Sequence, residues 1–533
     1  MQFDIALIGS GIACTQTLLQ ILQRLETDPV PFKNVRIAII EKDGEFWKGV
    51  AYGKKSSVNS LIITTLAEFI PADEKKDFID WLETNRDRWL KELKQSGGET
   101  AAQWIRHNRS AIQKGKWDEL YIPRVLYGSY LDARIRRAIK HAGKNGLAEI
   151  VEINAEATDL EMTPAGQYKI ILGDKETRLS SVISERVVLT LGSGNNKPIQ
   201  TPAVEIESRH IPFFYINDPY IPSMETNMRE IFSRISGIKD RGKRNILLLG
   251  SNASSLEILY FISSHPELSK KLNRVIVISH SGRLAHRITP DNFQDFVFEN
   301  LENLGKTKDF TAEKLFETLK EDLAIASEKG APVGDLIHKI NEQLEKLLKQ
   351  LGPIQEKEFY QVYGSSFSKL IRRAGAEYRD AAQRLIDNGK LVLVKGSFLK
   401  LKKSAAGLDG LMMEYSLTED KTPIFYPLHF PVVINCGGFE DLGESTLPLI
   451  ANLVQKEYCR VNRTRRGFEV SGNFEAAKNL YVMGPLLAGI FNDKVRHWHV
   501  ENLRRIHDMA PLISDVIVDS LHQNTPSLQQ TMG

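Results

Sequence analysis

Two glycines near the N-terminus have the spacing of a turn that binds a diphosphate. Gly9 and Gly11 flank Ser10 directly after an apolar run at residues 5–8, and leucines at helical spacing follow from Leu18. In a strand–turn–helix unit of this kind, the first glycine makes the turn, the second lets a diphosphate approach the backbone, and the helix N-terminus offers free N–H groups. The stretch therefore predicts a dinucleotide-binding site, with a tight turn that binds nothing as the alternative.

An acidic residue after the next apolar run supports this interpretation. Residues 35–40 have the pattern of a second buried strand, which ends at Glu41. A carboxylate at this position of a dinucleotide-binding unit accepts hydrogen bonds from ribose hydroxyls. The third small position of the motif is Cys14, which is compact enough to pack between helix and strand. We predict that Cys14 is a packing residue.

A second strand–turn–helix unit begins at residue 246. The apolar run at 246–249 leads into Gly250, but Asn252 stands where the first unit has its second glycine. A side chain there limits how closely a diphosphate can approach the backbone. After the strand that follows, Arg283 could hold the 2′-phosphate of NADPH, since a guanidinium pairs with phosphate oxygens. A solvent-exposed basic loop is the alternative for Arg283.

The elements that must position these residues form an α/β pattern. Two strand–turn–helix units in a chain of 533 residues predict two lobes. We predict a first lobe from residues 1–200 and 431–533, and a second lobe from residues 201–430. Residues 308–390 have the pattern of successive amphipathic helices inserted into the second lobe. These helices either pack through one face or form a lid over a substrate.

Composition excludes several classes of protein. The 70 basic and 67 acidic residues give a net charge of only +3, which gives no reason to propose a nucleic-acid partner. The three cysteines contain no CxxC pair, so we expect neither a dithiol site nor a thiolate metal site. The two histidines in residues 496–499 have no third ligand nearby, and we predict no metal. No apolar stretch approaches the roughly 20 residues that span a bilayer, so we expect no membrane partner and a cytoplasmic location.

Ten segments in order resemble the two-dinucleotide-binding-domain flavoproteins, in particular an FAD/NAD(P)-binding branch related to the N-hydroxylating flavin monooxygenases. These segments are Gly9 to Gly11, Glu41, GVAYG from Gly49, YIPRVLYGSYLDARIRRA, VVLTLGSG, INDPY, LLLGSNASSLE, VISHSGRL, VVINCGG and LYVMGPLLAG. The resemblance implies an α/β fold with two Rossmann-like domains. One is a glutathione-reductase-like FAD domain, and the other is an NAD(P)-binding-like domain with helical insertions.

The resemblance also implies where cofactors bind, with FAD in the first lobe and NADPH or NADH in the second. The stretch from Gly49 to Tyr52 would lie beside the flavin, residues 124–130 would form a wall of its site, and Gly489 would open a last helix facing the flavin. Together the motifs and the resemblance assign cofactor binding to Gly9, Ser10, Gly11, Ile12, Ala13, Glu41, Lys42, Gly49, Tyr52, Arg124, Tyr127, Gly192, Gly194, Gly250, Asn252, Ser254, Arg283, Gly484, Pro485, Gly489 and Ile490.

The implied activity is that of an FAD-dependent NAD(P)H oxidoreductase. In the monooxygenase form, a flavin hydroperoxide hydroxylates a nitrogen of a small-molecule substrate. The alternatives are a flavin dehydrogenase or oxidase without oxygen insertion, and a non-catalytic flavin or nucleotide sensor. The flavin carries the chemistry in such enzymes, and we predict no particular side chain as catalytic. The sequence defines neither the substrate nor the oligomeric state.

Overall fold

The structure is a computed structural model that describes most of the chain. The described residues are 1–31, 34–173, 179–199, 214–288, 293, 295–307, 309–403, 411–417 and 422–523. The predicted lobe boundary at residues 200 and 201 lies outside this part of the chain.

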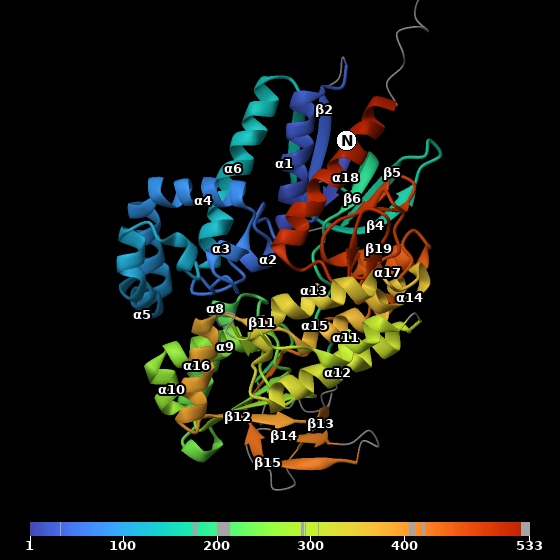
Figure 1. The fold of residues 1–533 in the computed structure, drawn as a ribbon. Helices are drawn as coiled ribbons and strands as arrows, with labels where there is room; N and C mark the ends of the chain where they lie inside the picture. The colour runs from blue at the N-terminus through green and yellow to red at the C-terminus, as the bar shows by residue number, and fades with distance from the viewer. Residues whose placement is uncertain are drawn as a thin grey trace, which may run out of the picture.

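The first lobe is built on an eight-stranded sheet (Figure 1). Its strands are β1 (Gln2–Ile8), β2 (Val35–Glu41), β3 (Ala148–Asn154), β4 (Glu156–Met162), β5 (Tyr168–Gly173), β6 (Ser181–Leu189), β17 (Glu475–Ala477) and β18 (Leu480–Val482). The order β18-β6-β1-β2-β3 is parallel throughout, while β17 is antiparallel at one edge and β4 and β5 form an antiparallel branch on β6. Since β18 pairs with β6, the two ends of the chain share one sheet.

The helices of the first lobe pack on this sheet or on one another, and they tie the two ends of the chain together. They are α1 (Ile12–Thr27), α2 (Gly49–Tyr52), α3 (Leu66–Phe69), α4 (Ala72–Thr84), α5 (Arg86–Gln113), α6 (Arg124–Lys144), α17 (Pro448–Gln455) and α18 (Leu503–Gln523), with short turns η1 (Trp117–Glu119), η5 (Leu442–Glu444) and η6 (Pro485–Leu487). In Figure 1, α18 (red) lies along α1 (blue), and the Ser514 hydroxyl donates to the Thr17 carbonyl at 3.1 Å. The buried Arg186 in β6 donates to the carbonyl and hydroxyl oxygens of Ser520, both at 2.6 Å. The C-terminal helix is therefore an integral part of the first lobe.

The second lobe repeats this arrangement around a five-stranded parallel sheet of order β12-β9-β8-β16-β7. Its strands are β7 (Phe214–Ile216), β8 (Asn245–Leu249), β9 (Arg274–Ser279), β12 (Leu391–Lys395) and β16 (Val432–Asn435), and an antiparallel sheet adds β13 (Ser397–Lys403), β14 (Leu411–Ser416) and β15 (Ile424–Phe430). Its helices are α8 (Met224–Gly237), α9 (Ala253–Ser264), α10 (Pro266–Lys271) and α16 (Ala376–Asp387), with η2 (Arg241–Lys243) and the paired strands β10 (His286–Arg287) and β11 (Arg373–Ala374).

These two sheets confirm the predicted α/β fold with two Rossmann-like units. In both lobes a central strand leads through a glycine turn into a helix, and the next strand of the unit pairs beside it. The predicted division returned the chain to the first lobe at residue 431. Because β16 pairs with β8 in the second sheet, we place the return after Asn435. The division into domains otherwise stays a prediction.

The helical insertion consists of α11 (Glu299–Lys306), α12 (Ala312–Glu328), α13 (Ile337–Leu348), α14 (Pro353–Glu358), the π-helical turn η4 (Phe359–Tyr363) and α15 (Gly364–Leu370), with η3 (Val333–Asp335). It has an apolar core of its own, against which Trp498 of the first lobe packs. Figure 1 shows these helices (yellow) crossing between the lobes. The Gln361 amide donates to the Gly489 carbonyl at 3.1 Å, and Arg496 pairs with Glu356 at 2.6 Å. The insertion is thus bound to the C-terminal part of the first lobe.

One predicted element is wrong. The helix expected to open at Gly489 is replaced by a hairpin of β19 (Ile490–Phe491) and β20 (Arg496–His497), and α18 begins only at Leu503. The Asn492 side-chain oxygen accepts from the backbone N–H groups of Lys494 and Val495, at 3.0 and 2.8 Å. Asparagine competes with helix formation through such local bonds, so the residue expected to start a helix makes a turn.

Candidate cofactor-binding site

The first glycine turn has a backbone that only glycine fits well. Gly9 has φ +91°, and a Cβ there would lie 2.7 Å from the Thr190 carbonyl oxygen. The carboxylate of Glu41, at the end of β2, accepts from the Ser10 amide at 2.9 Å and from the Ser10 hydroxyl at 2.8 Å. No side chain of the described residues caps the N-terminus of α1 at Gly11. The first-turn N–H groups of α1, at Ile12 and beyond, are therefore available to an anion.

The segment from Gly49 to Tyr52 packs directly on this turn. A Cβ on Gly49, which has φ +62°, would lie 2.9 Å from the Cα of Gly11. A Cβ on Gly128 would meet the Tyr52 carbonyl oxygen. The Tyr52 ring meets the edge of the Tyr127 ring with centroids 5.5 Å apart, and burial raises the pKa of Tyr52 to about 12. Gly128 lies in the predicted wall segment, residues 124–130, but was not itself assigned a role from the sequence.

The C-terminal segment also reaches the start of α1. Gly484 has φ +90°, and a Cβ there would lie 2.9 Å from the Cβ of Ala13. Pro485 follows in η6, and the Met483 amide donates to the Leu189 carbonyl at 2.9 Å. The structure therefore gathers four of the predicted stretches around the N-terminus of α1: residues 9–13, Glu41, Gly49 with Tyr52, and Gly484 with Pro485. The Cys14 side chain is fully buried beside them, as predicted for a packing residue.

Other predicted residues lie around this centre rather than in it. The Tyr127 hydroxyl is buried behind α1 and donates to Glu74 at 2.7 Å, and Lys42 pairs with Glu156 at 3.9 Å. Gly192 has φ +80° with open space beside it, and Gly194 faces the side chains of Leu442 and Glu440. Gly489 has φ +77° and packs on Thr464, while Ile490 begins the hairpin strand β19. The cofactor roles of these residues stay predictions.

Arg124, whose place in the flavin wall stays a prediction, links the two lobes. Its guanidinium donates to the Glu257 carboxylate of α9 and to the Ser56 hydroxyl, both at 2.8 Å. The Arg124 and Glu257 side chains are 13% and 4% exposed, so this is a nearly buried ion pair. Although burial works in the opposite direction, the Glu257 carboxylate raises the pKa of Arg124. The Ser60 hydroxyl also donates to Glu257, at 3.1 Å.

Sequence reasoning missed Glu257, yet a signal was present. Glu257 is the single charged side chain in the otherwise apolar stretch of α9, LEILYFI. A charged residue among apolar neighbours on a helix is rarely buried without a partner. Tyr378 on α16 adds to the same contact region, because its hydroxyl donates to the Leu61 carbonyl at 3.0 Å and accepts from the Leu61 amide at 2.7 Å.

The second turn is shaped like the first but carries a side chain. Gly250 has φ +103°, and a Cβ there would meet the Cys436 carbonyl oxygen. The Asn252 amide nitrogen donates to the same Cys436 carbonyl at 3.3 Å, and its oxygen accepts from the Arg372 guanidinium. Ser254 lies in the first turn of α9, and Arg283 is exposed after β9. Asn252 is thus held against β16 rather than left open above the turn.

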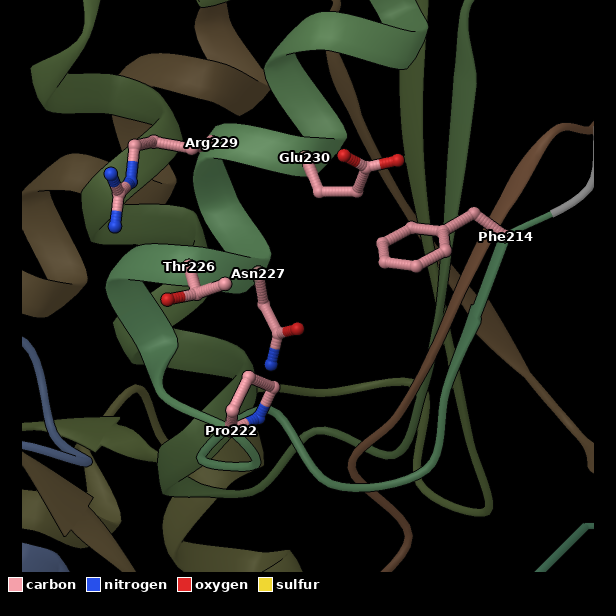
Figure 2. A pocket seen from close by; sticks show the side chains of 6 residues that line it. All are labelled: Phe214, Pro222, Thr226, Asn227, Arg229 and Glu230. Carbon is pink, nitrogen blue, oxygen red and sulfur yellow. The ribbon is translucent and has the colours of Figure 1, made fainter.

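A hollow of about 490 Å³ lies in the second lobe, apart from both turns. Figure 2 shows Phe214 of β7 facing Asn227 and Glu230 of α8 across it. Pro222, Thr226 and Arg229 complete the lining. This lining contains none of the residues predicted to bind a cofactor.

Comparison with known proteins agrees with this architecture. A family model described as FAD-NAD(P)-binding matches residues 6–194, which hold the first turn, Glu41, Gly49 and Arg124. An uncharacterized protein of Mycobacterium tuberculosis (strain ATCC 25618 / H37Rv) is 36% identical over 519 residues, covering 97% of this chain and 96% of its own. An uncharacterized protein of Mycobacterium bovis matches to the same extent. The chain belongs to the FAD-NAD(P)-binding family.

Membership of this family confirms FAD and a pyridine nucleotide, NADPH or NADH, as the cofactors. Among solved structures, the chain is similar to DfoA bound to FAD, described as the desferrioxamine biosynthetic pathway cadaverine monooxygenase from Erwinia amylovora. The TM-score is 0.52 at 12% identity, covering 98% of this chain and 95% of DfoA, which shows a shared fold. In the part of the chain that the structure describes, every helix is too short or too polar to cross a membrane.

Proposed function

We propose that the protein is an FAD-dependent NAD(P)H oxidoreductase that hydroxylates a nitrogen of a small-molecule substrate. The observation that carries the proposal is the position of the second turn relative to the first. Glu257 on helix α9, which follows Gly250, accepts hydrogen bonds from Arg124 and Ser60, and Arg124 also donates to Ser56. Ser56 and Ser60 come shortly after Tyr52, in the segment packed on the first turn. Two predicted nucleotide-binding units in contact across one interface would suit electron transfer between two bound cofactors.

The residues of the first lobe fit FAD. Gly9, Gly11 and Gly484 have no side chains, so a diphosphate can approach the backbone at these positions. The uncapped N-terminus of α1 favours the negative charge of the diphosphate. Glu41 lies beside Ser10, at the place where a ribose would meet the end of β2. When bound, FAD would accept a hydride from NAD(P)H and activate dioxygen. The chain's own part is to bind both nucleotides, orient them and exclude water from their contact.

Likeness to DfoA supports the nitrogen-hydroxylating form of the proposal. DfoA is described as a cadaverine monooxygenase, and the two chains share their fold over nearly their full lengths. We extend to this chain only the reaction class. A diamine is positively charged, and the cationic residues described below would repel it. The predicted cytoplasmic location agrees with a supply of NAD(P)H.

The test begins with the colour of the purified protein and its reduction without oxygen. We expect a yellow protein whose flavin absorbance is bleached by NADPH, and more slowly by NADH. Bleaching by neither nucleotide would contradict an oxidoreductase and favour the sensor. After oxygen is admitted with candidate amines, a hydroxylated amine supports the monooxygenase, whereas hydrogen peroxide alone identifies an oxidase.

A further inference from the structure

Cationic side chains from three segments, with two histidines from a fourth, gather where the insertion meets the C-terminal part of the first lobe. Arg505 of α18 donates to the His499 carbonyl at 2.6 Å and lies over the Trp498 ring at 5.4 Å. Arg466 comes from the loop whose Asn462 is bonded to the Ala488 carbonyl at 2.6 Å. We use the name cationic cluster for six residues: Lys369, Arg372, Arg466 and Arg505, together with His497 and His499.

The cationic cluster has far more positive than negative charge. One carboxylate, Glu501, lies among its four permanent cations in the described structure and pairs with Arg466 at 3.2 Å. Arg372 and Arg505 donate to neutral groups, the Asn252 amide oxygen and atoms of His499. Lys369 has no hydrogen-bond or ion-pair partner within the described residues. Lys369 is exposed, whereas Arg372 and Arg505 are partly buried, and charged side chains in that position normally have a counter-charge. The two arginines of the cationic cluster therefore lack their complement.

Both histidines of the cationic cluster have lowered pKa values, through burial first and the neighbouring arginines second. Burial, together with repulsion from Arg505, lowers the pKa of His497 to about 4. Burial and repulsion from Arg505, Arg372 and Arg466 lower the pKa of His499 to about 3. Both imidazoles are therefore neutral at neutral pH. His499 lies within the field of three guanidiniums that come from three different segments.

The cationic cluster extends from the β19–β20 hairpin to the second turn. His497 is directly opposite Ile490 in the β19–β20 hairpin, and Ile490 was predicted on the flavin side. At the other end, Arg372 is bonded to Asn252, which begins the helix after the second turn. A ligand bound by these cations would lie beside Asn252 of the second turn and the β19–β20 hairpin.

We propose that the cationic cluster binds a small polyanion, and that it does so by holding the carboxylate or phosphate groups of that ligand. Guanidinium groups bind both kinds of anion through paired, charge-assisted hydrogen bonds, and Lys369 adds a mobile ammonium. The identity of the ligand rests on the proposed function: either the substrate is an acid, or the anion is a phosphate group of the pyridine nucleotide. Binding itself does not depend on the reaction, so it can be tested separately.

Titration calorimetry of the flavin-loaded protein at low ionic strength tests the proposal, with inorganic pyrophosphate and succinate as probes. We expect saturable binding of at least one probe that weakens as salt is added. Lys369→Gln removes a charge that has no hydrogen-bond or ion-pair partner among the described residues, and Arg372→Gln removes the neighbouring charge that is bonded to Asn252. Each is expected to weaken binding about tenfold or more. Arg504→Gln is the matched control, because Arg504 is exposed next to Arg505 and its side chain makes no hydrogen bond with the described residues.

The same titrations with NADP⁺ distinguish the two sources of the anion. Competition between NADP⁺ and pyrophosphate, with equal losses in the variants, assigns the cationic cluster to the nucleotide phosphates. Loss of succinate or pyrophosphate binding with unchanged NADP⁺ affinity assigns it to an acidic substrate. Absence of binding by both probes at millimolar concentration, or equal losses in Arg504→Gln and Lys369→Gln, overturns the proposal. A protein that binds the probes but is not reduced by NAD(P)H would instead contradict the proposed function alone.

Discussion

Replacement of Gly11 by alanine separates folding from cofactor binding at the first turn. Gly11 has φ −74°, which alanine adopts readily, and its Cβ would lie 3.5 Å from the nearest heavy atom, the Cα of Gly49. That distance is ordinary van der Waals contact. At an N-cap, glycine is somewhat better than alanine, whereas alanine loses less backbone entropy on folding. We expect the free energy of unfolding of the apoprotein to change by less than about 1 kcal/mol.

The effect on FAD should be much larger. The added methyl group would stand at the point where the diphosphate has to reach the N–H groups of α1. Loss of one or two charge-assisted hydrogen bonds costs about 1.5–3 kcal/mol each. We therefore expect the Kd for FAD to rise at least about tenfold, and the purified variant to be pale or colourless.

Fluorescence titration of the apoprotein with FAD measures the Kd, and denaturant unfolding measures stability. Gly143→Ala is the control: Gly143 lies within α6, and its Cβ would be 3.9 Å from the Ala148 carbonyl oxygen. This control should keep FAD affinity and gain stability slightly. Wild-type FAD affinity in Gly11→Ala would refute the placement of the diphosphate at the first turn.

Three further predictions concern charges that the structure pairs or leaves exposed. Glu257→Gln leaves the nearly buried Arg124 without its carboxylate, so the free energy of unfolding, measured with denaturant, should fall by about 3 kcal/mol or more. A fall of less than about 1 kcal/mol would contradict a stabilising lobe contact. Against the effect of burial, contacts that include His507 lower the pKa of Glu74 from 4.5 to about 2. This group therefore contributes about 3 kcal/mol above pH 4.5, which is lost as the pH falls towards 2, and Glu74→Gln should flatten the stability profile over that window. Arg283→Ala should weaken NADPH more than NADH in binding titrations, and equal effects would remove its predicted contact with the 2′-phosphate.

Local patterns predicted the elements of both lobes because parallel strands buried on two faces are continuous apolar runs. Residues 5–8 and 246–249 each lie in the centre of a sheet, and the glycine that follows each has positive φ. The same patterns could not show that Gly484 lies against Ala13, since that contact joins opposite ends of the chain. The family resemblance, rather than the residues alone, indicated that the C-terminal segment returns to the first turn.

The hairpin at residues 490–497 shows why the end of the chain was harder to predict. Asn492 and Asp493 are common both in the first turn of helices and in turns between strands. What decides between them here is tertiary. Residues 489–498 are held by the insertion through Gln361 and Glu356, and such contacts come from elements more than 100 residues away.

Charged residues at the lobe interface are of two kinds, those paired with a counter-charge and those without one. Arg124 and Glu257 neutralise each other in a nearly buried pair that needs no ligand to hold α6 against α9. Such a pair adds specificity to an interface because removal of either partner leaves an uncompensated charge. The cationic cluster has the opposite character, since Arg372 and Lys369 face no carboxylate of the described residues other than Glu501. Because the paired charges already fix one side of the interface, an anion at the other side would meet guanidinium groups that are largely in place before it binds.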